Sequence, residues 1–335
     1  MTFTRKLVPP VIAIVLLSAY VLFLYAPAPR SCSFYSMGGI LTEIKTYGAG
    51  KKTHDAACAQ IRVFFENIEN EISNYRENSF LSNANRQKDK RAITLPEHTY
   101  RMIKESLRIS EITLGYFDIT VLPVLDLWKK AQKENKVPSA EELEAALKKV
   151  SYKKLALDDI GNPSPRLFFK VPGMELDLGA VAKGYMGDES RKIMERLGIQ
   201  RGLINCGGGI VVFDNRENPE DFTIKIYNPD KGVSAKPSPD NFGISSITMA
   251  NGSIQTSGDY NRFYTINGKR YSHIVDPHTG LPSGNCHSIT VKSTARVYSG
   301  AIADAYATAF CAMIAAGIPV SKLPVDEVEI LQLKK

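Results

Sequence analysis

The last third of the chain holds two oxygen-bearing side chains at a spacing that suits metal binding. Asp304 and Thr308 stand four residues apart in an otherwise apolar stretch. On a helix their oxygens share one face and could hold a hard cation. A buried carboxylate without a partner is costly, so Asp304 requires a metal or a hydrogen-bond network. The alternative is that Asp304 caps the start of the helix.

A second group of residues suits an anion. A predicted strand carrying Asp177 runs through Gly179 into a helix start, close to Lys183. Backbone N–H groups and an amine then converge where a phosphate could sit. Neither G-x-x-x-x-G-K-[ST] nor G-x-G-x-x-G occurs, and an ordinary capped helix is the alternative. The three glycines at 207–209 indicate that something approaches the backbone closely, or else a flexible turn.

Other chemically active residue types give weaker signals. Ser257, His273 and Asp276 are the residue types of a hydrolase triad, but no G-x-S-x-G surrounds a serine, which argues against a nucleophilic serine. Gly115 ends a predicted helix, and Asp118 follows it where a short strand is expected to begin. A helix cap and a turn former are the alternative for these two residues.

The elements that must position these residues alternate irregularly between strand and helix. Hydrophobic periodicity predicts strands at Ile40–Tyr47, Arg166–Val171, Gly202–Asn205, Phe222–Tyr227, Ser246–Ala250 and Ser288–Val291. It predicts helices at Ala56–Tyr75, Pro96–Leu114, Ser139–Val150, Ala182–Leu197 and Ala301–Ala316. Ser139 and Glu142 form a capping-box pattern. The order indicates an α+β fold without the regular rhythm of a doubly wound sheet.

Residues 1–30 differ from the rest. Arg5 and Lys6 precede an uncharged apolar run at 11–26, close to the length that spans a bilayer. We therefore expect a signal peptide or signal anchor at 1–30, with residues 31–335 as the folded domain on the far side of the membrane. Pro29 follows the small residues at 26–28 and fits cleavage poorly, which favours an uncleaved anchor.

Composition excludes some classes of protein. The chain is 44% hydrophobic, so it is not disordered. The net charge of +7 is spread along the chain without a basic block, which argues against nucleic acid but leaves an anionic ligand open. Five cysteines without a C-x-x-C pair predict no metal cluster. One disulfide is possible, although Cys58 and Cys311 lie in helix-like stretches and are expected to be buried small hydrophobes.

Seven motifs, in order over residues 33–320, closely resemble the FAD:protein FMN transferases, or ApbE-type flavin transferases. They are Ser36–Gly38, Ser73–Ser79, Gly115–Val121, Asp177–Tyr185, Thr256–Tyr260, Tyr271–Pro277 and Ala303–Thr308. The resemblance implies a T-fold-like α+β domain that binds FAD with Mg²⁺. It also implies transfer of FMN to a Ser or Thr hydroxyl of an acceptor protein, with release of AMP.

The same resemblance implies partners and a location. The acceptors are expected to be subunits of Nqr/Rnf-type membrane redox complexes, with the enzyme held at the bacterial inner membrane and its domain facing the periplasm. Some members hydrolyse FAD to FMN and AMP, so a FAD pyrophosphatase is the alternative. A non-catalytic flavin-binding protein is a third class, disfavoured because Asp304 and Thr308 are both present.

Site residues follow from the resemblance by position. Ala180, Asp304 and Thr308 would hold the metal. The FAD pocket would contain Met37, Tyr75, Tyr116, Phe117, Asp118, Asp177, Lys183, Gly208, Thr256, Ser257, His273 and Ile274. The base for the hydroxyl proton would be His273 or a carboxylate such as Asp276 or Asp304. The chain departs from the family pattern at Gly39, at Gly209, where Asp is common, and at Ala307, where some members carry an acidic residue.

Overall fold

The computed structural model describes residues 28–87, 92–159, 164–227, 242–259, 262–284, 286–323 and 325–334. Within these ranges, no helix combines the length and apolar character needed to cross a membrane. The apolar run at 11–26 lies outside the described residues, so the membrane segment expected at 1–30 stays a prediction. The folded domain, expected to begin at residue 31, has its first strand beginning at Arg30.

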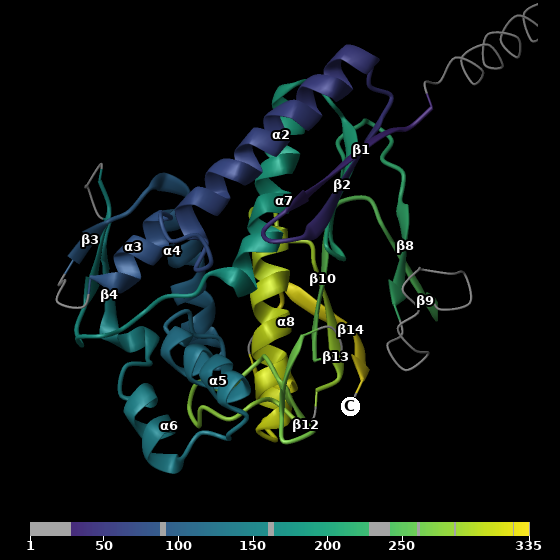
Figure 1. Ribbon diagram of the computed structural model, residues 1–335. Coiled ribbons are helices and arrows are strands. Elements are labelled where there is room, and N and C mark those ends of the chain that lie inside the picture. The colour runs from purple at the N-terminus through teal and green to yellow at the C-terminus, as the bar shows by residue number, and fades with distance from the viewer. Residues whose placement is uncertain are drawn as a thin grey trace, which may run out of the picture.

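A seven-stranded antiparallel sheet forms the centre of the fold (Figure 1). Its strands, in spatial order, are β1 (Arg30–Ser36), β2 (Ile40–Tyr47), β6 (Arg201–Cys206), β7 (Gly209–Asp214), β10 (Gly252–Gly258), β13 (Ser288–Ser293) and β14 (Val328–Lys334). Burial alternates along β6, as expected when the side chains of one strand point to two different environments. An α+β architecture is therefore confirmed.

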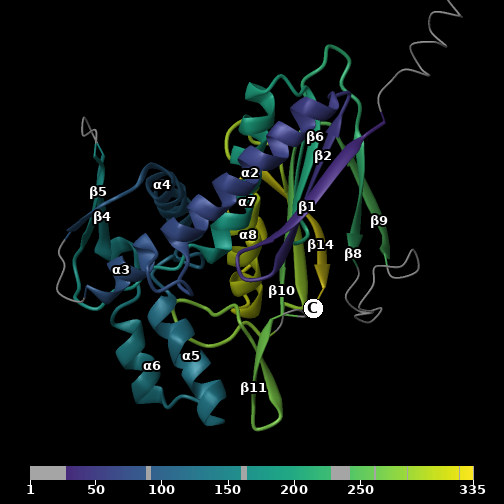
Figure 2. The ribbon, with the colours of Figure 1, turned by 45° about the horizontal axis from the view of Figure 1, so that its top comes forward.

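Three long helices cover one face of this sheet: α2 (Lys51–Ile72), α7 (Gly179–Arg196) and α8 (Ser299–Ala315). Figure 2 shows the hairpin of β8 (Phe222–Tyr227) and β9 (Phe242–Met249) on the other side of the sheet. Phe222, Ile224 and Met249 of this hairpin pack on Val212 and Ile254 of the sheet. Apart from a few polar residues, among them Asp304 and Thr308, helix α8 is apolar around its circumference, as expected for a helix buried between the sheet and other helices.

A second lobe lies across these helices from the sheet (Figure 1). It contains α3 (Phe80–Arg86), α4 (Glu97–Ile112), α5 (Leu122–Glu134), α6 (Ala140–Leu147) and a small sheet of β3 (Ala92–Thr94), β5 (Arg166–Phe169) and β4 (Leu155–Asp158). The hairpin of β11 (Phe263–Ile266) and β12 (Lys269–Ser272) joins it through Trp128, which packs on Tyr264 and Tyr271.

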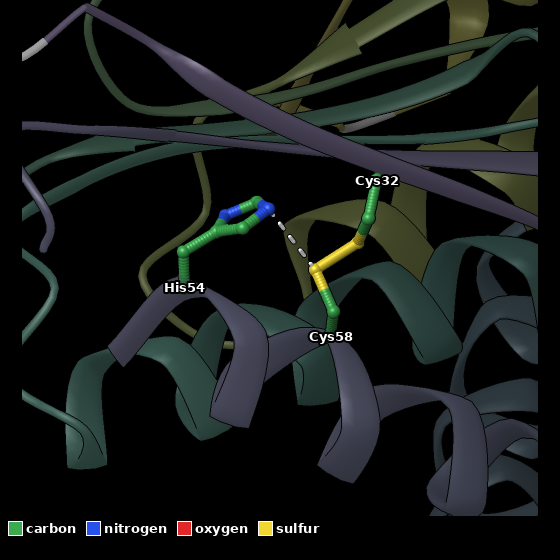
Figure 3. A group of neighbouring side chains, drawn as sticks. All are labelled: Cys32, His54 and Cys58. Carbon is green, nitrogen blue, oxygen red and sulfur yellow. Dashed lines mark hydrogen bonds between the residues drawn. A yellow bond between two sulfur atoms is a disulfide. The ribbon is translucent and has the colours of Figure 1, made fainter. Parts of the chain in front are cut away.

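Two disulfides tie strands or loops to the covering helices. Cys32 of β1 is bonded to Cys58 of α2 (Figure 3), and Cys286 is bonded to Cys311 of α8. The expectation that Cys58 and Cys311 are plain buried hydrophobes is therefore wrong. Each lies in a helix as expected, but its partner is distant in sequence, so the helical pattern could not reveal the pairing. Cys206 is free and buried.

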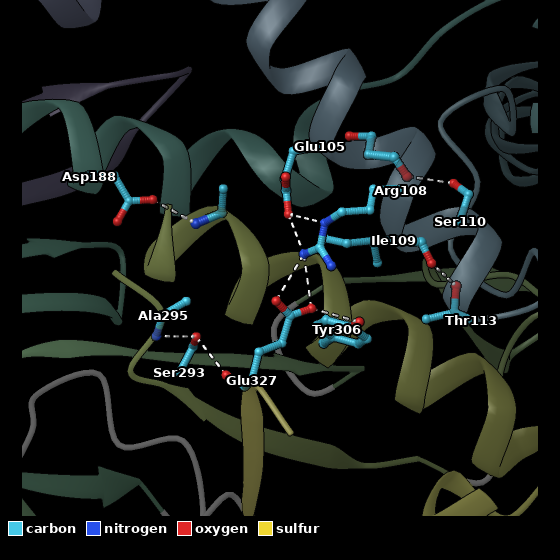
Figure 4. Close-up of polar contacts among 12 residues, drawn as sticks. Glu105, Arg108, Ile109, Ser110, Thr113, Asp188, Ser293, Ala295, Tyr306 and Glu327 are labelled. Carbon is cyan, nitrogen blue, oxygen red and sulfur yellow. Dashed lines mark hydrogen bonds and ion pairs between the residues drawn. The ribbon is translucent and has the colours of Figure 1, made fainter. Parts of the chain in front are cut away.

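Helices α7 and α8 cross in backbone contact. A Cβ on Gly184 would lie 1.9 Å from the Gly300 carbonyl oxygen, and one on Gly300 would lie 2.3 Å from the Gly184 oxygen. At this crossing, Asp188 of α7, labelled in Figure 4, lies beside α8. It accepts hydrogen bonds from the Gly300 and Ala301 N–H groups, both at 2.9 Å. Burial raises the pKa of Asp188 to about 7. Asp188, not Asp304, therefore caps α8.

A polar cluster closes the far side of α8. Arg108 of α4 donates to Glu327, just before β14, at 2.9 Å, and the Tyr306 hydroxyl of α8 donates to the same carboxylate at 2.9 Å (Figure 4). Glu105 also accepts from Arg108. The cluster joins the second lobe to the edge of the main sheet through charge-assisted hydrogen bonds.

Several predicted elements match the structure and one does not. The strand at 40–47 and the Ser139–Glu142 capping box are confirmed. The helix predicted from Ala56 begins at Lys51 and ends at Ile72. The strand expected after Gly115 is wrong: Leu114 and Gly115 adopt φ of 55° and 85°, and the chain turns into α5. Helix α5 is not predicted: no helix is expected between the one ending at Leu114 and the one beginning at Ser139.

The helix crossing gives a stability test. Gly184→Ala should destabilise the fold by at least about 3 kcal/mol, because its Cβ meets rigid backbone of α8 that can yield only by separating the helices. Gly50→Ala is the matched control: Gly50 has φ −65° and open space around its Cβ position, so a loss of about 1 kcal/mol or less is expected. Urea unfolding of both oxidised variants measures the difference. Equal losses would contradict the close crossing.

Candidate functional site

A cavity of about 1390 Å³ opens between the main sheet and the second lobe. Pockets for drug-sized ligands usually measure about 300–1,000 Å³, so this cavity suits a larger ligand. Its walls come from the β1–β2 turn, the α2–α3 loop, the segments at 116–121 and 177–183, the end of β10, and the segments at 262–264 and 273–277. Thr308 of α8 lies at its floor.

A buried ion pair lies directly beneath that floor. Asp304, 1% exposed, accepts from Lys183 Nζ at 2.8 Å and 3.1 Å on its two oxygens. The Gly184 N–H donates to the same carboxylate at 3.2 Å. Lys183 and Gly184 belong to the first turns of α7, and Asp304 lies in the middle of α8. The close helix crossing therefore supplies the positive charge that a buried carboxylate requires.

Hydroxyl groups extend this polar floor. Thr308 lies one turn beyond Asp304, and its Oγ1 is 3.2 Å from the Ser257 Oγ of β10 and donates to the Asp304 carbonyl at 3.3 Å. Ala180 lines the cavity at the start of α7. These groups offer oxygen donors, which suit Mg²⁺, an ion that commonly keeps waters and substrate phosphates as further ligands. The donor set of these residues therefore fits a hard cation, and in this structure the ammonium of Lys183 balances the charge of Asp304.

The Asp177 segment is held by two asparagines. Asn85 bonds the Leu176 backbone twice, donating to its oxygen and accepting from its N–H, each at 2.9 Å. Asn74 donates to the same oxygen at 3.0 Å and to Asp177 at 3.3 Å. Asp177 also accepts from the Gly179 N–H at 2.6 Å. Asp177 therefore fixes the backbone that enters α7 while it lines the cavity.

Asp118 likewise fixes the backbone of a cavity wall through hydrogen bonds. Its carboxylate accepts from the Thr120 N–H at 2.8 Å, the Thr120 hydroxyl at 2.7 Å and the Tyr152 N–H at 2.7 Å. Burial raises the pKa of Asp118. Phe117 beside it is almost fully buried, whereas Tyr75 across the cavity is 83% exposed. Both residues line the cavity, and the exposed ring of Tyr75 offers a face to a flat ligand.

His273 lies in the cavity wall in a defined tautomer. Its Nδ1 is 2.9 Å from the carbonyl oxygen of Arg262. Nδ1 must donate to that oxygen, which leaves Nε2 as the acceptor. Burial lowers the pKa of His273 to about 4. The imidazole is therefore neutral near pH 7 and can accept a proton or a hydrogen bond.

Asp276, unlike His273, does not line the cavity. Its carboxylate accepts from the His278 N–H at 2.9 Å, contacts His278 Nδ1 at 3.0 Å and accepts from Thr279 at 3.1 Å. Burial opposes its ionisation, but the hydrogen bonds from His278 outweigh burial and lower the pKa of Asp276. The carboxylate closes its own turn and is not among the described residues that line the cavity. Its assignment as a catalytic base therefore stays a prediction, and of the two residues only His273 lines the cavity.

The cavity brings together most of the predicted site residues. Those that line it are Met37, Tyr75, Tyr116, Phe117, Asp118, Asp177, Ala180, Lys183, Thr256, Ser257, His273, Ile274 and Thr308. Gly208, Asp276 and Asp304 are not among these lining residues. Asp304 lies behind Lys183, which does line the cavity. The Gly208 N–H donates to Asn205 in the β6–β7 turn, and Gly207 lines the cavity instead. Sequence reasoning missed the cations Arg76, Lys129 and Arg262 in the lining, because isolated basic residues in loops and helices carry no pattern.

Two departures from the family pattern have a packing explanation. A Cβ on Gly209 would lie 2.0 Å from Oε1 of Gln255, so Gln255 occupies the space that a side chain at 209 would need. Ala307 is fully buried in the main core cluster. The third departure, Gly39, has a conformational explanation: it adopts a φ of 118° in the β1–β2 turn, where a residue with a Cβ would be strained.

Comparison with known proteins identifies relatives. The model of the ApbE family matches residues 38–321. A FAD:protein FMN transferase of Klebsiella pneumoniae is 30% identical over 245 residues, which cover 72% of this chain and 72% of that protein. The ApbE protein of Thermotoga maritima is similar in structure, with a TM-score of 0.76, 29% identity and coverage of 91% and 94%. The flavin transferase ApbE of Vibrio cholerae gives a TM-score of 0.64, 25% identity and coverage of 90% and 96%.

The protonation of His273 can be measured directly. In an NMR titration, its ring signals, assigned by their loss in His273→Gln, should stay constant from about pH 8 to pH 5 and move near pH 4. His278 is the internal comparison, because its hydrogen bond to Asp276 raises its pKa above 6.5. The pKa of His273 is 6.5 in the unfolded chain and about 4 in the folded protein. As pH falls between these two values, only the unfolded chain takes up the proton, so the free energy of unfolding decreases. A midpoint near 6.5 would refute the buried neutral imidazole.

Proposed function

This chain belongs to the ApbE family, and on that premise we propose that it transfers the FMN half of FAD to a hydroxyl of an acceptor protein. The observation that carries the proposal is the cavity itself: it is large enough for a dinucleotide and has a lysine and two hydroxyls at its floor, with a buried carboxylate bonded to the lysine beneath them. That floor is where the pyrophosphate of FAD would lie.

The reaction breaks the phosphoanhydride bond between the two phosphates of FAD and forms a phosphoester bond to the acceptor. The acceptor oxygen, from a Ser or Thr hydroxyl, forms a bond to the phosphorus on the FMN side of the pyrophosphate. The bond from that phosphorus to the bridging oxygen breaks, and AMP leaves with this oxygen. The hydroxyl proton must be taken up as the bond forms. Phosphoryl transfer of this kind depends mostly on charge neutralisation and alignment.

The metal assignment rests on the floor of the cavity. Asp304, Thr308 and the backbone of Ala180 are the groups that would hold Mg²⁺. When bound there, the ion supplies neutralisation of phosphate charge. Because Lys183 pairs with Asp304, its ammonium must give way to a metal, and it then becomes free for the anionic pyrophosphate beside it.

Other residues orient the substrate and receive the proton. Tyr75 offers a stacking face for the flavin or the adenine. Arg76, Lys129 and Arg262 make the lining favourable to an anion. His273 is the residue we assign as the proton acceptor, since its Nε2 is unprotonated near pH 7 and Asp276 is bound within its own turn.

The proposal also covers where the protein works and which class of protein accepts the FMN. Two disulfides suit an oxidising compartment, which agrees with the signal or anchor segment predicted at residues 1–30. We propose that the domain works on the extracytoplasmic side of a bacterial inner membrane. Acceptor subunits of Nqr/Rnf-type redox complexes would then be within its reach.

The transfer is tested by incubating the protein with FAD, Mg²⁺ and a candidate acceptor domain. We expect stoichiometric AMP release and an acceptor whose mass has risen by one FMN unit. AMP release without acceptor modification would replace the transferase with a FAD pyrophosphatase. Bound FAD without AMP release in the presence of several acceptors would leave only a flavin-binding protein.

The metal assignment is tested by Asp304→Asn. Removing the buried carboxylate should lower Mg²⁺-dependent AMP release by about 100-fold or more, which corresponds to roughly 3 kcal/mol of lost transition-state stabilisation. Asp55→Asn is the matched control, because Asp55 forms only an exposed pair with Lys51. Circular dichroism establishes that both variants fold. A folded Asp304→Asn variant with near-normal turnover would rule out this carboxylate as the metal ligand.

A further inference from the structure

Three side chains with soft metal-binding atoms meet away from the cavity (Figure 3). Cys32 comes from the edge strand β1, and His54 and Cys58 come from one face of α2. One ligand atom from each lies within 4.8 Å of the other two, and no other trio of His, Cys, Asp or Glu in the described residues meets this condition. None of the three is among the residues that line the cavity.

The distance between His54 and Cys58 is close to that in a tetrahedral zinc site, whereas the two sulfurs are bonded to each other and must separate on reduction. His54 and Cys58 are four residues apart on α2, and His54 Nε2 lies 3.4 Å from Cys58 Sγ. Zinc bonds of about 2.3 Å to sulfur and 2.0–2.1 Å to nitrogen place such atoms about 3.6 Å apart in a tetrahedron. Two thiolates and an imidazole are ligands that select zinc over hard cations such as Mg²⁺.

A neighbouring hydroxyl already orients the histidine. Nδ1 of His54 lies 2.9 Å from the hydroxyl of Thr46 on β2, and both residues are buried. This contact directs Nε2 toward the two sulfurs, as outer partners of metal-binding histidines do. The alternative is that His54 is a buried core residue whose ring is hydrogen-bonded to Thr46 and has no metal-binding role.

We propose that the reduced form of this cluster binds one zinc ion through Cys32, His54 and Cys58. The disulfide takes two electrons and two protons from a dithiol reductant, which becomes a disulfide itself. Zinc then displaces the two thiol protons as it binds the thiolates. The disulfide and the zinc site exclude each other because both use the same two sulfurs.

Either form fastens β1 to α2. Strand β1 leads through Tyr35 and Ser36 to Met37, which line the cavity. Both sulfur-bearing residues are partly exposed, so a reductant and a metal can reach them. Zinc would therefore keep this wall of the cavity attached when the disulfide is reduced, and a water or another ligand would complete the tetrahedron.

The test compares zinc binding by the oxidised and the phosphine-reduced full chain. The reduced protein should bind one Zn²⁺ per chain, and Co²⁺ in its place should give the sulfur-to-cobalt absorption of a tetrahedral thiolate site. The oxidised protein should bind none at this site. Reduced His54→Gln should bind at least about 10-fold more weakly, and Thr46→Val, which removes the outer partner, about 10-fold more weakly.

The second disulfide provides the matched control. The double variant Cys286→Ser/Cys311→Ser should keep the full zinc stoichiometry when reduced, because no histidine completes a trio there in the described residues. Equal zinc binding by oxidised and reduced protein, or unchanged affinity in a folded His54→Gln variant, would overturn the proposal. The comparison measures metal binding alone, so its outcome is independent of flavin transfer.

Discussion

A carboxylate in the middle of an apolar buried helix must be paired, and the site is organised around that requirement. Asp304 is paired because α7 and α8 approach closely at Gly184 and Gly300, which brings Lys183 onto it. Asp188 stabilises the same crossing by capping α8. The interaction that makes the core stable is thus the one that places charge at the floor of the cavity.

The remaining polar residues of the cavity mostly shape its walls. Asp118 and Asp177 bond backbone N–H groups of their own segments, and Asn85 fixes Leu176 from both sides. These bonds are satisfied before any ligand enters, so the walls are largely preformed. Chemistry then rests on fewer groups: the Lys183–Asp304 pair, the hydroxyls of Thr308 and Ser257, and the neutral ring of His273.

The sequence indicates which residues belong to the site more reliably than what each one does. The spacing of Asp304 and Thr308 and the Asp177–Lys183 segment predict the floor, because both depend on local helix geometry. Asp276 beside a histidine has the same pattern whether it acts as a base or closes a turn, and only the contacts of His278 and Thr279 distinguish the two. The Arg262 carbonyl that sets the tautomer of His273, the Asn85 clamp and both cysteine pairs arise from contacts between distant segments. No local pattern encodes these contacts.

The central claim is that Asp304 is a cation-holding carboxylate to which Lys183 is bound when no metal is present. Crystals grown with FAD and Mn²⁺, a scattering substitute for Mg²⁺, test it by anomalous diffraction. We predict a manganese peak bound by the Asp304 carboxylate and the Thr308 hydroxyl, next to the pyrophosphate, with Lys183 turned from Asp304 toward the phosphates. Manganese elsewhere in the cavity, with the Lys183–Asp304 pair intact, would contradict the claim.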